Sequence, residues 1–490
     1  HGRVPDLDGI GTIQLLGSIA MDSLRISAGV DSYPRLGDRV YAAPHSFIAN
    51  LPKFMEAAEA EASHVLLKLG SSDVAPESYV SVKPEKLFGR HCAILGATGG
   101  GKSWTTARII EECLRYKTKI ILLDATGEYR GFDGEHVANF HLGAPVNTAK
   151  SSAPCTLPQT SFIESDFIAL FEPAGKVQGP KLRAAIRSLR LAALAPHVAT
   201  GGIIKKIDQS KVPIMTEEAK AGIAEKLDDP QQAFDVWKLV SQIEQECVYA
   251  DGFGSARGQK DFTKWGGDSG EVSFCLSLMS RINGILSSSS FECVFKSKAP
   301  ALTEKISSFV SNEDRLLRIC LSGVAFEFKA REIVANVIGR HLLNMARNGA
   351  FKSRPVVVIV DEAHNFLGRQ IGADDAVARL DAFELIAKEG RKYGLNICLS
   401  TQRPRDITEG VLSQMGTLVV HRLTNDRDRE VVERACGEVD RSASSFLPNL
   451  KPGEAAIIGA DFPIPLTIQV FPPSAKPLSD GPNYQTNWKV

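Results

Sequence analysis

The sequence lacks an excess of charge of either sign. Its 490 residues include 57 Lys and Arg against 57 Asp and Glu, so the formal net charge is zero. Proteins that coat nucleic acid with their whole surface carry a strong positive charge, and this composition excludes that class. The balance still allows DNA contact through a local basic patch, or through a patch that the assembly of several subunits concentrates.

Paired cysteines and long apolar runs are also lacking. The nine cysteines are scattered and contain no C-x-x-C pair, which excludes a zinc ribbon and a disulfide framework. Apolar runs such as Val356–Val360 are far shorter than the roughly 20 residues that span a bilayer. His1-Gly2-Arg3 lacks the apolar region of a signal peptide, and no starting Met precedes it, which is consistent with a natural chain that begins earlier. We therefore expect a cytoplasmic protein with reduced thiols and no membrane contact.

The length predicts more than one structural unit, since single domains usually hold about 100–200 residues. Short β-type runs such as Leu24–Ser27 and Arg39–Ala42, interrupted by one helix over Lys53–Ser63, favour a small β-barrel at the N-terminus. Further along, strands alternate with helices, which is typical of an α/β fold with a mostly parallel sheet. The expected parts are an N-terminal barrel (1–87), a first core segment (88–149), a helical insertion (150–302), a second core segment (303–470) and a tail (471–490).

A phosphate-binding loop is the most specific motif. The segment Gly96–Ser103 fits G-x-x-x-x-G-K-S and stands between a predicted strand and a predicted helix. In such loops backbone N–H groups surround the phosphates, the lysine (Lys102) reaches the β- and γ-phosphates, and the serine hydroxyl (Ser103) binds Mg²⁺. We therefore expect ATP and Mg²⁺ as cofactors. The predicted nucleotide-binding residues are Gly96, Ala97, Thr98, Gly99, Gly100, Gly101, Lys102, Ser103 and Trp104.

Two further strands end in polar residues that suit nucleotide hydrolysis. Val356–Val360 is followed by Asp361, a candidate Mg²⁺ ligand, and by Glu362, a candidate general base. Successive residues of a strand point to opposite faces, so the two carboxylates cannot share one role. A strand that ends in Asp-Glu can also be an ordinary surface feature. Its occurrence together with the phosphate loop favours the catalytic interpretation. The other strand, Asn396–Ser400, leads to Gln402, a candidate sensor of the γ-phosphate.

Candidate DNA contacts lie in the predicted insertion. Between Lys176 and Lys211 there are eight basic residues and one acidic residue. Arg183, Arg187 and Arg190 have helical spacing and share one face. A solvated amphipathic helix explains this pattern, and so does a ring of copies that faces DNA phosphates. The basic and aromatic segment 257–265 has the same two interpretations, as an ordinary surface loop or as a pore element.

Several families of nucleotide-hydrolysing proteins do not fit. Asp361 lies 259 residues after Lys102, whereas helicases with an Asp-Glu-Ala-His box place the two motifs much closer together. An ABC-type signature and the protein-kinase motifs are missing. The chain instead resembles the HerA branch of the HerA–FtsK ATPases. The segments that carry the resemblance are Gly89–Ser103, Leu123–Tyr129, Asp361–Phe366, Glu389–Gly394 and Ser400–Pro404.

The resemblance implies a RecA-like P-loop core with an N-terminal β-barrel, a helical insertion and a C-terminal brace. It also implies a homohexameric ring that hydrolyses ATP at subunit boundaries and moves double-stranded DNA through its pore. A separate effector polypeptide is expected, either a NurA-type or other nuclease in DNA end processing or a sirtuin-like NAD-consuming enzyme in anti-phage defence. A different class of function is a nucleotide-gated scaffold that activates an effector without productive translocation.

The resemblance also assigns individual roles. Arg90 matches an arginine that reaches the nucleotide of a neighbouring subunit, and Arg391 matches a second arginine at the γ-phosphate. Glu362 matches the catalytic base, and Gln402 matches the sensor. Arg90 also suits a solvated charge at a strand end, and Arg391 suits a charge at a helix C-terminus. Asp124 and Glu128 stand at the end of a core strand and suit a role near Mg²⁺, a contact with the adjacent subunit, or a structural role.

Overall fold

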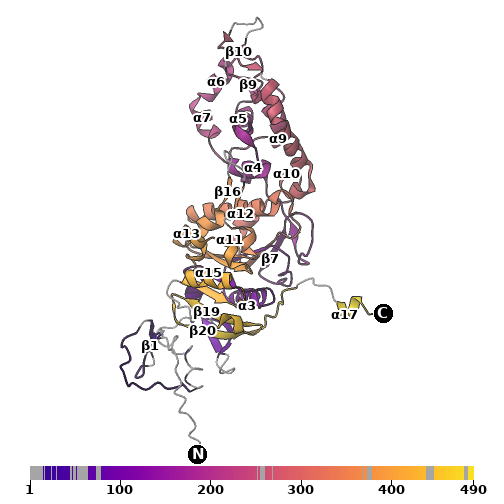
Figure 1. The fold of residues 1–490 in the computed structure, drawn as a ribbon. Coiled ribbons are helices and arrows are strands. Elements are labelled where there is room, and N and C mark those ends of the chain that lie inside the picture. Colours follow the sequence, from indigo (N-terminus) through magenta and orange to yellow (C-terminus); the bar gives the residue numbers. More distant parts are fainter. Residues whose placement is uncertain are drawn as a thin grey trace, which may run out of the picture. The chain divides into compact units, whose positions relative to one another are not determined.

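The computed structural model describes most of the chain in two units. The described residues are 15, 17–23, 25–28, 30–44, 47, 51, 65–72, 79–250, 252–253, 260–267, 269–367, 369–371, 378–436, 446–478 and 484–489. Unit 1 comprises His1–Lys117 and Asn396–Lys476, and unit 2 comprises Thr118–Leu395 and Pro477–Val490. Both units combine parallel strands with helices (Figure 1). The predicted α/β fold class is therefore confirmed.

Unit 1 is built on a mixed sheet with the strand order β4-β3-β20-β19-β18-β5-β17. The bounds of these strands are β3 Leu67–Ser72, β4 Tyr79–Val82, β5 Cys92–Leu95, β17 Leu395–Thr401, β18 Thr417–Val420, β19 Glu454–Gly459 and β20 Phe462–Val470. Strand β5 pairs in parallel with β17 and β18, and the remaining pairs are antiparallel. All four residues of β5 are buried, as the apolar run predicts for a strand with neighbours on both sides.

The long helix of unit 1 is α3, Lys102–Leu114. Two charged side chains on it join it to strand β3. The Arg108 guanidinium donates to the carbonyl of Lys68 from Nε at 3.1 Å and from Nη2 at 2.9 Å, and the Glu112 carboxylate accepts from the Lys68 N–H at 2.9 Å. Arg108 and Glu112 also form a buried ion pair with each other. The shorter helices of this unit are α2 Pro84–Phe88, α14 Glu409–Leu412 and α15 Asp426–Cys436.

Unit 2 has an all-parallel set of strands in the order β14-β6-β13-β7-β8. Their bounds are β6 Ile120–Asp124, β7 Val137–His141, β8 Ala153–Pro154, β13 Leu316–Cys320 and β14 Val356–Val360. Strands β6 and β13 are buried along their whole length. The helices that accompany these strands are α11 Leu302–Ser311, α12 Ala330–Arg347 and α13 Ala382–Glu389. Because β6 and β14 are parallel neighbours, their carboxyl ends lie next to each other.

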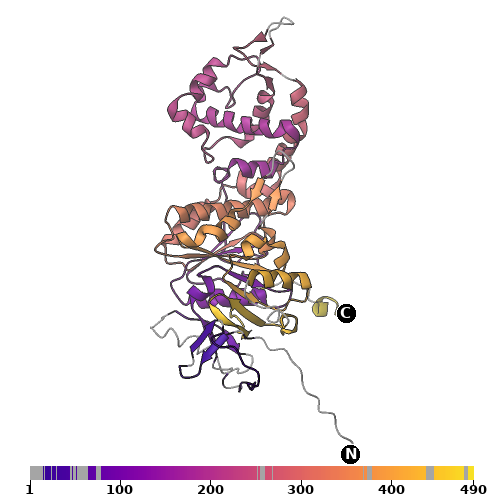
Figure 2. The same ribbon diagram turned by 60° about the vertical axis from the view of Figure 1, so that its left-hand side comes forward.

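Helices dominate residues 150–302 of unit 2. They are α4 Glu164–Phe171, α5 Gly175–Leu194, α6 Val212–Glu218, α7 Ala221–Leu227, α8 Leu239–Glu246, α9 Ser269–Ser287 and α10 Glu292–Phe295. In Figure 2, α5 crosses the middle of this group. A bidentate ion pair joins α4 to α12, because Arg340 donates to both carboxylate oxygens of Asp166, one of them at 2.9 Å. Four short strands complete the group: β9 Val248–Tyr249, β10 Gly252–Phe253, β11 Lys260–Asp261 and β12 Gly266–Gly267.

The N-terminal prediction is tested only in part. Residues 53–63 lie outside the described part of the chain, so the predicted helix there stays a prediction, as does the barrel. Strands β1 (Gly17–Ala20) and β2 (Arg25–Ala28) form a two-stranded antiparallel sheet. The predicted strand at Arg39–Ala42 is wrong: these residues are exposed and form no strand. Two aromatic or β-branched residues give that run its β-type pattern, but no strand in the described part of the chain pairs with them.

Two predictions concern features that the sequence lacks, namely disulfide bonds and membrane-spanning segments. Eight cysteines are free thiols with buried side chains: Cys92, Cys113, Cys155, Cys247, Cys275, Cys293, Cys320 and Cys398. Within the described ranges, every helix is too short or too polar to cross a lipid bilayer. The predicted domain boundaries remain predictions, and the remaining elements are β15 Arg369–Ile371, β16 Ala378–Leu380 and α17 Tyr484–Asn487.

Candidate active site

The phosphate loop of unit 1 connects the buried strand β5 to helix α3. Gly99 has φ +76° and Gly101 has φ +117°, a left-handed conformation that glycine adopts without a steric penalty. The loop is held from two sides, since Ala97 N–H donates to the Arg422 carbonyl at 3.0 Å and Gly453 N–H donates to the Gly100 carbonyl at 3.2 Å. The backbone conformation therefore favours glycine at positions 99 and 101, whatever the loop binds.

The first turn of α3 is suited to an anion. Gly101 is the N-cap residue and supplies no side-chain cap, and the first turn contains no acidic residue. Helix N-termini carry unpaired N–H groups and a partial positive charge, which favour phosphate. Lys102 lies in this turn with a mostly buried side chain, followed by the half-buried Ser103 and the exposed Trp104. The ammonium of Lys476 lies over the Trp104 ring, 5.9 Å from its centroid.

The structure brings Gln402 to the phosphate loop. The Thr98 hydroxyl donates to Gln402 Oε1 at 2.6 Å, and Gln402 directly follows strand β17. Because β17 and β5 are parallel neighbours, their carboxyl ends meet at one sheet edge. This places two of the predicted residues together, while their roles toward a nucleotide stay predictions.

A buried histidine, which the sequence pattern did not single out, supports the same loop. His421 Nε2 lies 2.8 Å from the Thr105 hydroxyl, and its Nδ1 lies 2.8 Å from the Glu454 carbonyl oxygen. A Cβ atom added to Gly96 would stand 2.6 Å from His421 Cβ, so the loop packs directly on this side chain. Burial lowers the pKa of His421 to about 4, and the nearby charge of Lys102 contributes in the same direction. The imidazole is therefore neutral at pH 7.

Arg90 lies in unit 1, just before strand β5. Its side chain is 52% exposed, and its Nε atom is 3.9 Å from the Asp461 carboxylate. Its backbone carbonyl accepts from Gly416 N–H at 2.7 Å. An exposed ion pair of this length is weak, so the guanidinium is available to another molecule. The position suits either the solvated charge or the contact with a neighbouring subunit that the sequence predicts.

In unit 2, Asp361 and Glu362 follow strand β14. Asp361 is buried, and its N–H donates to the Leu123 carbonyl at 3.1 Å. Glu362 has φ +48°, a left-handed conformation that is rare for a residue other than glycine. Its carboxylate lies 3.2 Å from His364 Nδ1. The backbone therefore turns sharply at Glu362, and each carboxylate has its own surroundings, while the roles predicted for the two residues stay predictions.

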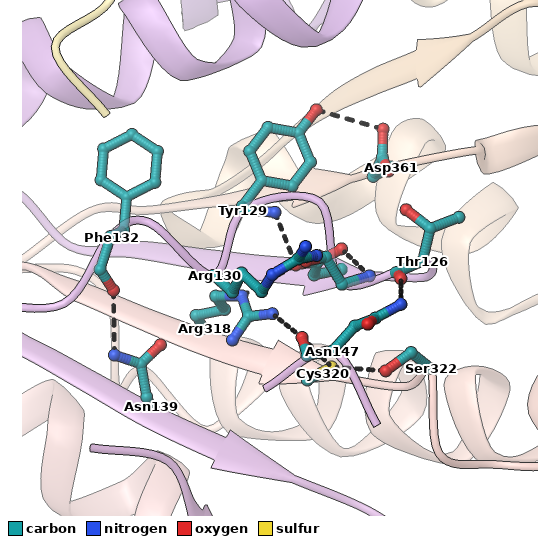
Figure 3. A network of polar contacts seen from close by, with 12 residues as sticks. Thr126, Tyr129, Arg130, Phe132, Asn139, Asn147, Arg318, Cys320, Ser322 and Asp361 are labelled. Atoms are coloured by element: carbon teal, nitrogen blue, oxygen red, sulfur yellow. Dashed lines mark hydrogen bonds and ion pairs between the residues drawn. The ribbon is translucent and has the colours of Figure 1, made fainter. Parts of the chain in front are cut away.

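A fully buried ion pair organises the neighbouring strand end (Figure 3). Arg318 Nε donates to Asp124 Oδ2 at 2.8 Å, and both side chains have no exposed surface. The same carboxylate accepts from the backbone N–H groups of Gly127 at 2.7 Å and Tyr129 at 3.1 Å. Asp124 is therefore enclosed by three donors. This arrangement favours the structural role that the sequence left open for Asp124 over direct contact with Mg²⁺.

Arg391 lies in the short helical turn Gly390–Tyr393 after α13, with an exposed side chain. Glu128 is half-buried, and its backbone carbonyl accepts from Leu478 N–H at 2.8 Å. Both positions belong to unit 2. The γ-phosphate role of Arg391 stays a prediction.

The basic helix α5 differs from its prediction. Arg190 is buried, not on an exposed face, and donates to the carbonyls of Leu227 at 3.1 Å and Pro230 at 3.2 Å. Arg183 pairs with Glu164, and Arg187 pairs with Glu218 and Asp228. The three arginines thus do not form one free basic stripe. Helical spacing alone missed this because their acceptors lie far away in sequence.

The two predicted Mg²⁺ ligands, Ser103 and Asp361, are both oxygen donors. Over the described ranges, no cluster of three His, Cys, Asp or Glu side chains suits a metal ion. Mg²⁺ commonly takes one or two protein oxygens and keeps waters and phosphate oxygens as its other ligands. The Ser103 hydroxyl and the Asp361 carboxylate fit that chemistry, whereas soft or nitrogen-preferring metals would require other side chains.

Comparison with known proteins identifies relatives. Residues 67–238 match the sequence profile of the central domain of helicase HerA. A probable helicase of Methanocaldococcus jannaschii is 24% identical over 466 residues, covering 94% of this chain and 79% of the relative. The DNA double-strand break repair helicase HerA of Saccharolobus solfataricus is 23% identical over 404 residues, covering 82% of this chain and 68% of the relative.

Among solved structures, the bacterial conjugative coupling protein TrwB in a complex with sulphate is similar. It has a TM-score of 0.49 and 15% sequence identity, and the match covers 86% of this chain and 92% of TrwB. The HerA profile overlaps the phosphate loop, and the similarity to the two helicases extends over most of the chain. These matches confirm the predicted resemblance of the chain to the HerA-type ATPases of the HerA–FtsK superfamily.

Proposed function

We propose that this chain is an ATP-driven motor that assembles as a homohexamer and moves double-stranded DNA through a central pore. The observation that carries the proposal is the phosphate loop at the head of α3, with Lys102 in the first helical turn and Gln402 bonded to Thr98. The names of the HerA relatives, which describe DNA double-strand break repair helicases, support the DNA part.

The proposal gives roles to all the predicted site residues. The loop Gly96–Gly101, Lys102, Ser103 and Trp104 bind the nucleotide, Lys102 also takes part in catalysis at the β- and γ-phosphates, and Gln402 senses the γ-phosphate. Ser103 and Asp361 hold Mg²⁺, which would neutralise phosphate charge during transfer. Glu362 accepts a proton from the attacking water. Arg90 and Arg391 stabilise the charge on the transferring phosphoryl group, Arg90 from a neighbouring subunit.

The effector belongs to a separate polypeptide in this proposal, either a nuclease or a sirtuin-like NAD-consuming enzyme. DNA end processing and anti-phage defence are the two settings that fit such a pairing. Co-purification of the chain with the product of a neighbouring gene, followed by nuclease and NAD-consumption assays on the complex, distinguishes them.

The contacts made by the arginines of helix α5 favour a second candidate function. This candidate is a nucleotide-gated scaffold that activates its effector without moving DNA. Arg183, Arg187 and Arg190 are already engaged by acids or carbonyls of the same chain. The two candidates differ in how ATP hydrolysis depends on DNA. ATPase activity should rise with double-stranded DNA and with its length if the chain is a motor, and hydrolysis that is indifferent to DNA would exclude the motor.

A further inference from the structure

We propose that Tyr129 is a positioning residue for Asp361, so that the tyrosine hydroxyl sets the Mg²⁺ affinity of the nucleotide site. The inference rests on the Mg²⁺ role given to Asp361 in the proposed function. Its structural basis is a chain of contacts within unit 2 that runs from the buried Arg318–Asp124 pair, through the turn after β6, to Asp361 (Figure 3).

The hydroxyl of Tyr129 contacts the carboxylate directly. Tyr129 Oη lies 3.3 Å from Asp361 Oδ1, and the two side chains are 1% and 3% exposed. The phenol donates its proton, because an ionised carboxylate only accepts. A hydrogen bond to Oδ1 restricts rotation of the carboxylate. It thereby sets the direction of the oxygen lone pairs that remain for another ligand. Residues that hydrogen-bond to a metal ligand, without touching the metal, commonly change the metal affinity.

The backbone of Tyr129 is fixed independently of its ring. Its N–H donates to Asp124 Oδ2 at 3.1 Å, and Gly127 N–H donates to Asp124 Oδ1 at 2.7 Å. Gly127 has φ +84°, and an added Cβ would stand 2.4 Å from Asn147 Cβ, so the turn admits no side chain at this position. Arg318 donates to Asp124 Oδ2 at 2.8 Å and to the Asn147 carbonyl at 3.2 Å. The turn therefore fixes the backbone that carries the phenol, and from this position the hydroxyl contacts Asp361.

The test is Tyr129→Phe, which removes the hydroxyl and keeps the buried ring. Binding of a fluorescent ATP analogue is measured in EDTA and then during titration with Mg²⁺. We expect the Mg²⁺ concentration at half-effect to rise about fivefold, a modest change because the hydrogen bond is long, while affinity in EDTA stays the same. Tyr116→Phe is the matched control: its hydroxyl donates to the Leu66 carbonyl at 3.0 Å in unit 1, and its Mg²⁺ titration should match the wild type.

A double variant separates positioning from general damage. In an Asp361→Asn background the Tyr129→Phe change should no longer alter the Mg²⁺ titration, since the carboxylate that it orients is gone. An unchanged titration for Tyr129→Phe alone, or equal shifts in both backgrounds, would overturn the inference. If the wild type and Asp361→Asn respond equally to Mg²⁺, the role proposed for Asp361 fails instead, and the two failures are distinguishable.

Discussion

The imidazole of His421 and the hydroxyl of Thr105 are 2.8 Å apart, so a residue that follows strand β18 is bonded to the helix that begins at Lys102. The other ring nitrogen faces the Glu454 carbonyl oxygen, and that nitrogen must carry the proton because a carbonyl only accepts. Nε2 is then an acceptor for the threonine hydroxyl. The neutral tautomer of His421 is thus specified by its two partners.

Protonation of His421 should destabilise the folded chain. Its pKa falls from the ordinary 6.5 to about 4 on folding, chiefly through burial, so the stability present above pH 6.5 is lost as pH falls from 6.5 toward 4, by about 3 kcal/mol at most. His421→Gln should remove this part of the pH dependence of thermal unfolding between pH 7.5 and 5. The control is His197→Gln, at a 64% exposed histidine. The prediction is contradicted if the stability of His421→Gln falls as steeply on acidification as the stability of the wild type.

Removal of the carboxylate proposed as the general base should separate ATP binding from turnover. Glu362→Gln keeps the size and shape of the side chain but cannot accept the proton, so ATP binding should persist while hydrolysis falls by about 10²-fold or more. Single-turnover hydrolysis and equilibrium ATP binding measure the two effects. Glu313→Gln, at a 73% exposed carboxylate of the same unit, should leave both unchanged. Substantial residual hydrolysis in Glu362→Gln would assign the base to another residue.

Arg90 should act on the nucleotide of another subunit. Arg90→Ala is expected to bind ATP normally and to hydrolyse it about 10³-fold more slowly, whereas Arg115→Ala, at a 57% exposed arginine of the same unit, should be neutral. Mixing Arg90→Ala with Lys102→Ala subunits should restore part of the activity, because some sites then combine an intact Lys102 with an intact Arg90. Failure of every mixing ratio to recover hydrolysis argues against action between subunits.

Breaking the buried ion pair should be costly. Arg318→Met leaves the Asp124 carboxylate buried with its two backbone donors and without its counter-charge, and should lower the free energy of unfolding by about 3–5 kcal/mol. Arg354→Met removes a 48% exposed arginine that is 4.0 Å from Glu313 and should cost less than about 1 kcal/mol. Urea unfolding of both variants measures the difference. Similar costs would mean that Asp124 does not depend on Arg318.

Local patterns were sufficient for the parts of the site that depend on neighbours in sequence. The glycines of 96–101, the lysine and serine that follow, and the carboxylates after Val356–Val360 are all set by a strand end and the turn after it. Such turns require particular residue types whatever the rest of the fold does. The strands of the core were predictable for the same reason, since continuous apolar runs mark strands that are buried on both faces.

Contacts between distant segments were not predictable in this way. His421 lies 316 residues from Thr105, Arg318 lies 194 residues from Asp124, and Tyr129 lies 232 residues from Asp361. Nothing in the local pattern around Arg190 indicates that its acceptors are carbonyls near Leu227, so helical spacing placed it wrongly on an exposed face. The sequence by itself determined the α/β class, the phosphate loop and the acidic strand end. Only the tertiary structure decided which polar side chains are buried and paired, because hydrogen-bond partners are chosen by the packing of whole strands and helices.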